Sequence, residues 1–182
     1  MDSITLWDKS FVPFIPQADI EKAVDAVAER INADFADSGE IPVLLCVLNG
    51  SIVFTAALMQ RLSFQAELVS MKLSSYEGTQ STGNVRQVMG LSGSVKDRRV
   101  IIVEDIVDTG TTIVDLTNIV RAYGAKEVRV CTLLLKPDVY DKNVPLDYVG
   151  MSIPNRFIVG YGLDYNELGR GLKDIYVLDE SK

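Results

Sequence analysis

Three short, mostly apolar segments constrain the fold of this chain more than any other feature of its sequence. They are residues 43–48 (VLLCVL), 99–104 (RVIIVE) and 127–135 (EVRVCTLLL). A strand with little polar alternation predicts burial on both faces, which is typical of parallel sheets covered by helices. The sequence therefore predicts an α/β fold with a central, mainly parallel sheet flanked by helices.

The segments between these strands predict helices and loops. Apolar residues recur at steps of three or four over residues 19–35, as in an amphipathic helix. Residues 74–97 are rich in Ser, Gly and Thr and predict a long loop. Helices are also predicted over residues 51–62 and 111–123, and further strands over residues 66–73, 148–152, 157–161 and 175–178.

Composition narrows the classes of function. The chain has 182 residues, which suits a single domain, and its net charge of −7 argues against a nucleic-acid or anionic-membrane partner. It contains no histidine, so Ser-His-Asp nucleophiles and His-ligated zinc sites are excluded. Cys46 and Cys131 lie inside apolar segments, which favours buried free thiols over a disulfide. With no basic region leading into an apolar N-terminal stretch, we expect a cytoplasmic protein.

The most informative motif is Val103–Thr112 (VEDIVDTGTT), which follows a predicted strand and opens a predicted helix. Backbone N–H groups and the helix dipole converge on an anion at such a position. Glu104 and Asp105 would repel a phosphate unless they contact hydroxyl groups or a cation such as Mg²⁺. Alternatively, the two acids are solvated and Asp108 only caps the helix.

This motif resembles the phosphoribosyl-pyrophosphate-binding motif of type I phosphoribosyltransferases. The resemblance implies that Glu104 and Asp105 hold the ribose hydroxyls and Mg²⁺. It also implies that Asp108 is the general base toward the incoming base. The ligand-binding positions that it implies are Glu104, Asp105, Ile106, Val107, Asp108, Thr109, Gly110, Thr111 and Thr112, of which Asp108–Thr112 would cradle the 5′-phosphate.

Two further segments resemble the hypoxanthine-guanine branch of that family. Leu48-Asn49-Gly50 looks like its pyrophosphate loop, in which the dipeptide often has a cis bond, although several relatives carry Lys where this chain has Asn49. A plain turn is the alternative. Ser74–Gly83 resembles the loop that closes over the site, and Ser75 and Tyr76 are its implied lid residues. A surface loop without function is the alternative.

The segment Phe157–Asp164, followed by Arg170, resembles the base-binding end of the same branch. The resemblance implies that Phe157 stacks on the purine, that the backbone of Ile158 reads its edge, and that Arg170 binds pyrophosphate. Lys136 would donate a hydrogen bond to a 6-oxo group. Asp164 is implied both at the base-binding end and, with Glu104 and Asp105, as a ligand of Mg²⁺. Read singly, Phe157 is a core residue, and Lys136 and Arg170 are surface charges.

Together these resemblances imply an enzyme that transfers 5-phosphoribosyl from phosphoribosyl pyrophosphate to hypoxanthine or guanine with Mg²⁺. They also imply one domain over residues 1–182, with a core over about 17–148 and a small hood from about 1–16 and 149–182. A homodimer or homotetramer is expected. Xanthine or adenine as the accepted base, and an RNA-binding regulator on the same fold, are the alternatives.

Overall fold

The structure is a computed structural model of the chain and describes residues 2–74 and 86–181. Its central sheet has the strand order β5-β4-β3-β6-β7-β8. The strands are β3 (Val43–Leu48), β4 (Glu67–Ser74), β5 (Arg86–Met89), β6 (Arg99–Val107), β7 (Glu127–Leu135) and β8 (Tyr148–Ser152).

Five of these strands are parallel, which confirms the predicted sheet. β3 pairs with β4 and β6, and β6, β7 and β8 follow one another in parallel register. β5 pairs antiparallel with β4. The prediction of a loop over residues 74–97 was therefore wrong over Arg86–Met89. The backbone groups on the outer edge of β4 need partners, and β5 supplies them although its sequence lacks an apolar run.

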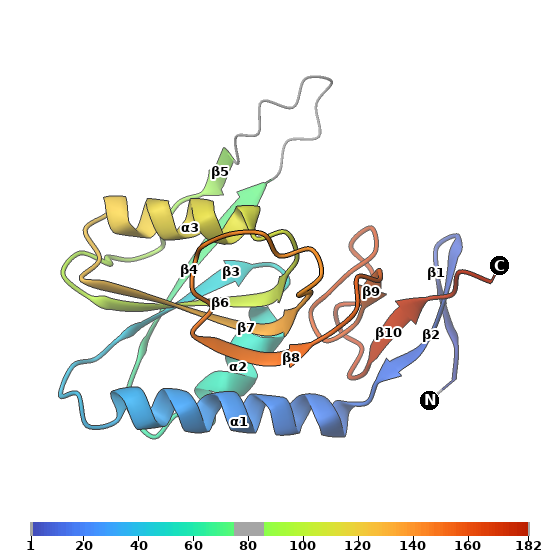
Figure 1. Cartoon of the computed structure of the whole chain (residues 1–182), viewed down its shortest axis with the longest axis horizontal. Helices are drawn as coiled ribbons and strands as arrows, with labels where there is room; N and C mark the ends of the chain where they lie inside the picture. Colours follow the sequence, from blue (N-terminus) through green and yellow to red (C-terminus); the bar gives the residue numbers. More distant parts are fainter. Residues whose placement is uncertain (1, 75–85, 182) are drawn as a thin grey trace.

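Helices cover both faces of the sheet, as Figure 1 shows. The helices are α1 (Gln17–Phe35), α2 (Ile52–Met59) and α3 (Thr111–Ala122). In β3, Leu44 packs into the cluster beneath α1 and α2, while Val43 and Leu45 pack into the cluster beneath α3. Alternate side chains of one apolar strand are thus buried on opposite faces, as its sequence predicted.

A small antiparallel sheet forms the predicted hood from the two ends of the chain. It has the order β1-β2-β10-β9, and the strands are β1 (Ile4–Leu6), β2 (Lys9–Ile15), β9 (Ile158–Val159) and β10 (Ile175–Leu178). β1 and β2 were not predicted as strands. Pro13 argues against a strand by sequence, but it lies opposite a register irregularity in β10, where a missing N–H is tolerated.

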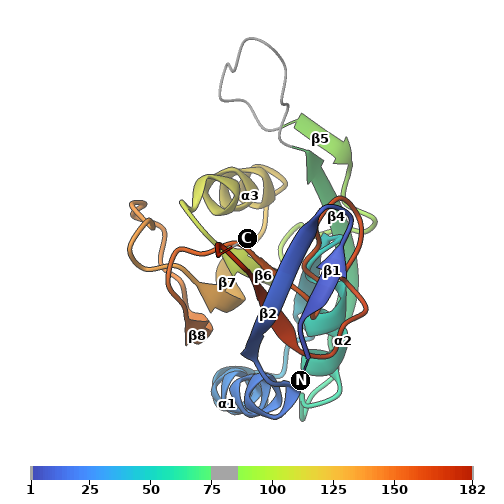
Figure 2. The same cartoon turned by 90° about the vertical axis from the view of Figure 1, so that its right-hand side faces the viewer.

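The hood lies beyond the carboxyl ends of the central strands (Figures 1 and 2). β8 belongs to the central sheet, so that sheet continues to Ser152. The division into core and hood within one domain remains our proposal, with a boundary nearer residue 152 than residue 148.

Strand order creates one crevice at the carboxyl edge of the sheet. From β3 the chain crosses to β4 on one side, and from β6 it crosses to β7 and β8 on the other side. The loops that leave β3 and β6 therefore turn away from each other and leave a gap between them. Ligands of open α/β sheets bind at such a switch point.

Both cysteines are buried and free, as predicted, Cys46 in β3 and Cys131 in β7. Across residues 2–74 and 86–181, no helix is both long and apolar enough to cross a membrane.

The Tyr148 hydroxyl fastens α1 to the edge strand β8, and its loss should destabilise the fold. It donates to Oδ2 of Asp34 at 2.6 Å, and the tyrosine is 2% exposed. We expect Tyr148→Phe to lower the free energy of unfolding by about 1 kcal/mol, the usual net value of one such bond. Urea unfolding would measure the change, and Asp34→Ala, which removes the acceptor, would complete the cycle with the double variant. Additive losses in the double variant would contradict the bond.

Candidate active site

The loop between β6 and α3 forms a cradle whose geometry suits an anion. Gly110 has φ of 85°, and a methyl group there would lie 2.4 Å from Cε2 of Tyr140, so only glycine fits. The carbonyl of Gly110 accepts the first helical bond, from the Val114 N–H at 3.1 Å. The preceding N–H groups of α3 are left without helical partners. The residues that carry them belong to the wall of a cavity of about 290 Å³, which is lined by residues Glu104–Ile113.

Glu104 and Asp105 lie at the base of this cradle, within β6. Glu104 is 6% exposed, and burial raises the pKa of its carboxyl group well above the usual range. Burial likewise raises the pKa of Asp105 to about 6, although a backbone bond from the Ile106 N–H at 2.8 Å and the charge of Arg170 act in the opposite direction. Two adjacent buried carboxyl groups with raised pKa values are typical of a functional site and not of two solvated acids.

The β3 loop packs directly on Asp105. The Leu48–Asn49 peptide bond is cis, as the resemblance implied. A methyl group at Gly50 would lie 1.7 Å from Oδ2 of Asp105, so any side chain there would displace the carboxylate. Gly162, in the hood, is equally constrained, since its methyl group would lie 2.0 Å from the Gly50 carbonyl oxygen. The loop after β3, the end of β6 and the hood thus meet at one point.

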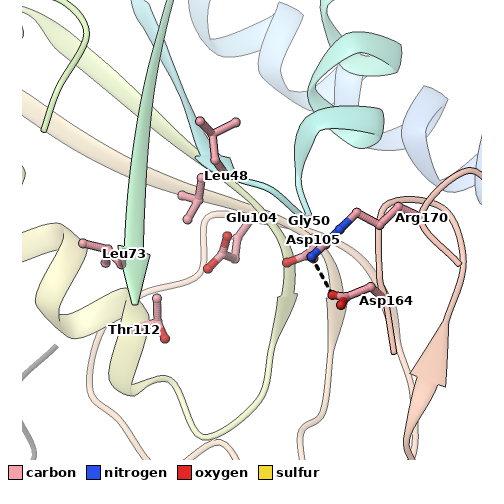
Figure 3. A pocket seen from close by; sticks show the side chains of 9 residues that line it. Leu48, Gly50, Leu73, Glu104, Asp105, Thr112, Asp164 and Arg170 are labelled. Atoms are coloured by element: carbon pink, nitrogen blue, oxygen red, sulfur yellow. Dashed lines mark ion pairs between the residues drawn. The ribbon is translucent and has the colours of Figure 1, made fainter. Parts of the chain in front are cut away.

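These three segments enclose a second cavity, of about 270 Å³, shown in Figure 3. In that view Glu104 and Asp105 of β6 and Asp164 and Arg170 of the loop between β9 and β10 lie around a common space. The full lining is Val47, Leu48, Gly50, Leu73, Glu104, Asp105, Thr112, Asp164 and Arg170.

Arg170 is held by acids of its own loop. Its guanidinium contacts Oδ1 of Asp164 at 2.7 Å and Oε2 of Glu167 at 3.2 Å, and it donates to the Gly162 carbonyl at 2.9 Å. The Glu167 N–H donates to Asp164 Oδ2 at 2.8 Å. The arginine is therefore already oriented toward the cavity, and both carboxylates depend on it for charge balance.

Asp108 and Lys136 form an ion pair at the carboxyl ends of β6 and β7. Lys136 Nζ lies 2.9 Å from Asp108 Oδ2. The lysine is 8% exposed, whereas the aspartate side chain is 51% exposed. A buried ammonium group beside an accessible carboxylate presents a donor and an acceptor side by side, which is unlike the solvated turn lysine that Lys136 suggests when read alone.

Neither Phe157 nor Ile158 lines either cavity. Phe157 is 46% exposed, and its ring lies 5.9 Å edge-on from the ring of Tyr165, while Ile158 is buried in β9. Asn49 is also absent from the walls, although its neighbours Leu48 and Gly50 line the second cavity. Ser75 and Tyr76 lie outside the described residues.

Several residues of the site were missed by sequence reasoning. Leu73 lines the second cavity, and Glu167 shares Arg170 with Asp164. Tyr140 packs against Gly110 although thirty positions separate them. The sequence gives no signal for these residues, because a leucine, a glutamate or a tyrosine has no evident role until the residue it contacts is known. Among the residues described, no three acidic or cysteine side chains form a cluster that could hold a metal ion by themselves.

Comparison with known proteins agrees with this geometry. The phosphoribosyl transferase domain family matches residues 16–166. The chain is 39% identical over 167 residues to the hypoxanthine-guanine-xanthine phosphoribosyltransferase of Tritrichomonas foetus, covering 91% of this chain and 90% of that protein. It is 36% identical over 170 residues to the hypoxanthine phosphoribosyltransferase of Escherichia coli, covering 91% and 96%.

Solved structures extend the similarity to three dimensions. A hypoxanthine phosphoribosyltransferase from Staphylococcus aureus superposes with a TM-score of 0.86 at 33% identity, over 93% of this chain and 92% of that one. The hypoxanthine phosphoribosyl transferase of Trypanosoma cruzi gives a TM-score of 0.88 at 32% identity, over 98% and 96%. With the cradle, the buried acids and the ion pair in place, the chain belongs to the phosphoribosyltransferase family.

Proposed function

We propose that this chain transfers the 5-phosphoribosyl group of phosphoribosyl pyrophosphate to hypoxanthine or guanine and releases pyrophosphate, a purine salvage reaction. Its relatives are named for these bases, and one of them also for xanthine. The family identifies the transferred group, but the accepted base has to be argued from the site.

The Lys136–Asp108 pair is the observation that carries the proposal. A 6-oxopurine has its oxygen beside N7 on one edge, and in the N7–H tautomer that edge offers an acceptor next to a donor. Lys136 Nζ and Asp108 Oδ2, 2.9 Å apart, supply the complementary donor and acceptor. Adenine would place an amino group against the ammonium group and leave both donors unsatisfied.

The remaining substrate groups match the two cavities. The 5′-phosphate would occupy the cradle of Asp108–Thr112, where backbone N–H groups, the helix dipole and threonine hydroxyls are donors. Glu104 and Asp105 would accept hydrogen bonds from the ribose hydroxyls. Leu48–Gly50 would present backbone groups to the pyrophosphate, and Arg170 its fork of donors.

The acidic side chains of the second cavity fit a magnesium ion. Glu104, Asp105 and Asp164 supply hard oxygen donors, and burial raises the pKa of the first two carboxyl groups, so that a cation beside them would favour their charged forms. They do not form a self-sufficient metal cluster, which suits an ion held by one or two carboxylates and by substrate oxygens. When bound, Mg²⁺ would neutralise the leaving pyrophosphate.

The chain's own residues would do the rest by position and charge. As the bond to pyrophosphate breaks, positive charge develops on the ribose ring, and the carboxylates of Glu104, Asp105 and Asp108 stabilise it. Asp108 accepts the purine proton as the ring nitrogen attacks the anomeric carbon. Phe157 and the backbone of Ile158 would hold the base against this point, with Asp164 near it, and Ser75 and Tyr76 would belong to a lid that excludes water.

The cellular location, oligomeric state and macromolecular partners of the chain stay predictions. Buried free thiols support a reducing, cytoplasmic location. A homodimer or homotetramer is supported by Ile52 and Leu68, which are about half exposed beside an apolar cavity of about 370 Å³. No nucleic-acid or membrane partner is proposed.

The accepted base should change when Lys136 is replaced. We expect the wild-type chain to use hypoxanthine and guanine and to reject adenine. Lys136→Met keeps the volume of the buried stem and should cut the preference for hypoxanthine over adenine by about 10- to 100-fold. Initial rates with four bases (hypoxanthine, guanine, xanthine and adenine) would test both statements. Equal use of adenine by the wild-type chain would overturn the proposed base.

Asp108→Asn should slow chemistry without weakening binding. An amide can still accept the hydrogen bond of Lys136, but it cannot take the purine proton. We expect kcat to fall about 100-fold or more, with little change in KM for phosphoribosyl pyrophosphate. Steady-state kinetics with hypoxanthine would measure the change, and near-normal turnover would show that Asp108 is not the base.

Asp105→Asn should stabilise the ligand-free protein at high pH. The pKa of this carboxyl group is about 6 in the folded state and 3.8 ordinarily, so the folded state loses stability as pH rises from about 4 to about 6. Removing the charge should raise the urea midpoint at pH 8, with the gain absent below about pH 4. The same variant should bind phosphoribosyl pyrophosphate with Mg²⁺ more weakly. A midpoint at pH 8 below that of wild type would contradict the cost of the buried charge.

A further inference from the structure

The phosphate cradle is short of positive charge. Its cavity of about 290 Å³ is lined by Glu104–Ile113, a stretch with the acids Glu104, Asp105 and Asp108 and no lysine or arginine. A phosphate monoester carries about two negative charges, whereas a helix N-terminus is equivalent to only about half a positive charge. If the cradle binds a 5′-phosphate, as the proposed function requires, a cation from elsewhere should help to hold it.

Two nearby cations are already engaged. Lys136 is paired with Asp108 and, in the proposed reaction, turns to the base. Arg170 is paired with Asp164 and Glu167 in the other cavity. Neither can neutralise the 5′-phosphate without giving up these contacts.

Lys142 lies against the cradle from the outside. It belongs to the segment that joins β7 to β8, and that segment packs on α3 and the sheet through Tyr140 and Val144. A methyl group at Gly110 would lie 2.9 Å from Cγ of Lys142, so the stem of the lysine passes directly beside the turn that starts α3. Neighbouring Tyr140 packs its ring on the same glycine, which sets the position of this segment.

The ammonium group of Lys142 is held only lightly. In the part of the chain that the structure describes, its ion pair is with its sequence neighbour Asp141, at 2.5 Å, whose side chain is 69% exposed. The lysine side chain is 32% exposed, and a pair with so exposed an aspartate is worth little, so water can replace the lysine there at small cost. The flexible stem lets the charge move while its base stays packed on Gly110.

We propose that Lys142 is a further binding residue for the 5′-phosphate, which it reaches by exchanging Asp141 for a phosphate oxygen when phosphoribosyl pyrophosphate binds. The inference rests on the proposed function. It gives the cradle a mobile cation and assigns a role to a loop residue that would otherwise only pack beside Gly110.

Lys142→Met separates the charge from the packing, because methionine keeps an unbranched apolar stem beside Gly110. Lys126→Met is a matched control. Lys126 is likewise a lysine paired with one acid, Glu40 at 2.5 Å, but it is more exposed and precedes β7 at the opposite end of the sheet. Both variants change the net charge equally, so a difference between them reports position and not the overall field.

Titration calorimetry with ribose 5-phosphate, and separately with pyrophosphate and Mg²⁺, tests the assignment. We expect Lys142→Met to weaken ribose 5-phosphate binding about tenfold relative to Lys126→Met, with pyrophosphate binding unchanged and a shallower salt dependence. Lys142→Arg should restore most of the affinity. In kinetics, KM for phosphoribosyl pyrophosphate should rise while kcat stays within about twofold.

Two results would overturn the assignment while leaving the proposed function intact: equal ribose 5-phosphate affinity in the two methionine variants, or an equal loss of pyrophosphate affinity in Lys142→Met. A wild-type chain that binds neither phosphoribosyl pyrophosphate nor ribose 5-phosphate would remove the proposed function and this inference with it.

Discussion

The close contact between Gly50 and Asp105 organises the site. There the loop leaving β3 lies so near the carboxylate that a single methyl group would come within 1.7 Å of it. Gly162 brings the hood against the same loop. Asp105 lies in β6, next to β3 in the sheet, so this contact ties the loop after β3 to β6 and, through Gly162, to the C-terminal segment. Both cavities share Glu104 and Asp105 in their walls.

Charge explains how an acidic chain can bind a polyanion. Burial raises the pKa of the Glu104 and Asp105 carboxyl groups, and in our proposal a metal ion and sugar hydroxyls would offset the cost of their charged forms. In our proposal the phosphates would be held by backbone N–H groups and by a few cations at the rim, namely Arg170 and Lys142. Burying these charges thus lowers the free energy of unfolding of the ligand-free protein, and such a loss of stability is common at binding sites.

Much of the fold followed from local pattern. The apolar runs at residues 43–48 and 127–135 coincide with β3 and β7, because strands buried on both faces have no polar positions to obscure them. β1, β2 and β5 were missed, since edge and hood strands are short and part-polar, and pairing with distant segments decides them. At the site, Val103–Thr112 was recognised because it is contiguous in the sequence. In the structure its first five residues, Val103–Val107, belong to β6, and only the rest forms the loop and the start of α3.

The sequence by itself determined the mainly parallel sheet, the anion cradle at the start of α3 and the family resemblance, because each depends on residues adjacent in the chain. Only the tertiary structure decided which distant residues meet: Lys136 with Asp108, Gly50 with Asp105, and Tyr140 and Lys142 with Gly110. The physical reason is that strand order and close packing set these contacts, and neither leaves a periodic trace in the residues between them.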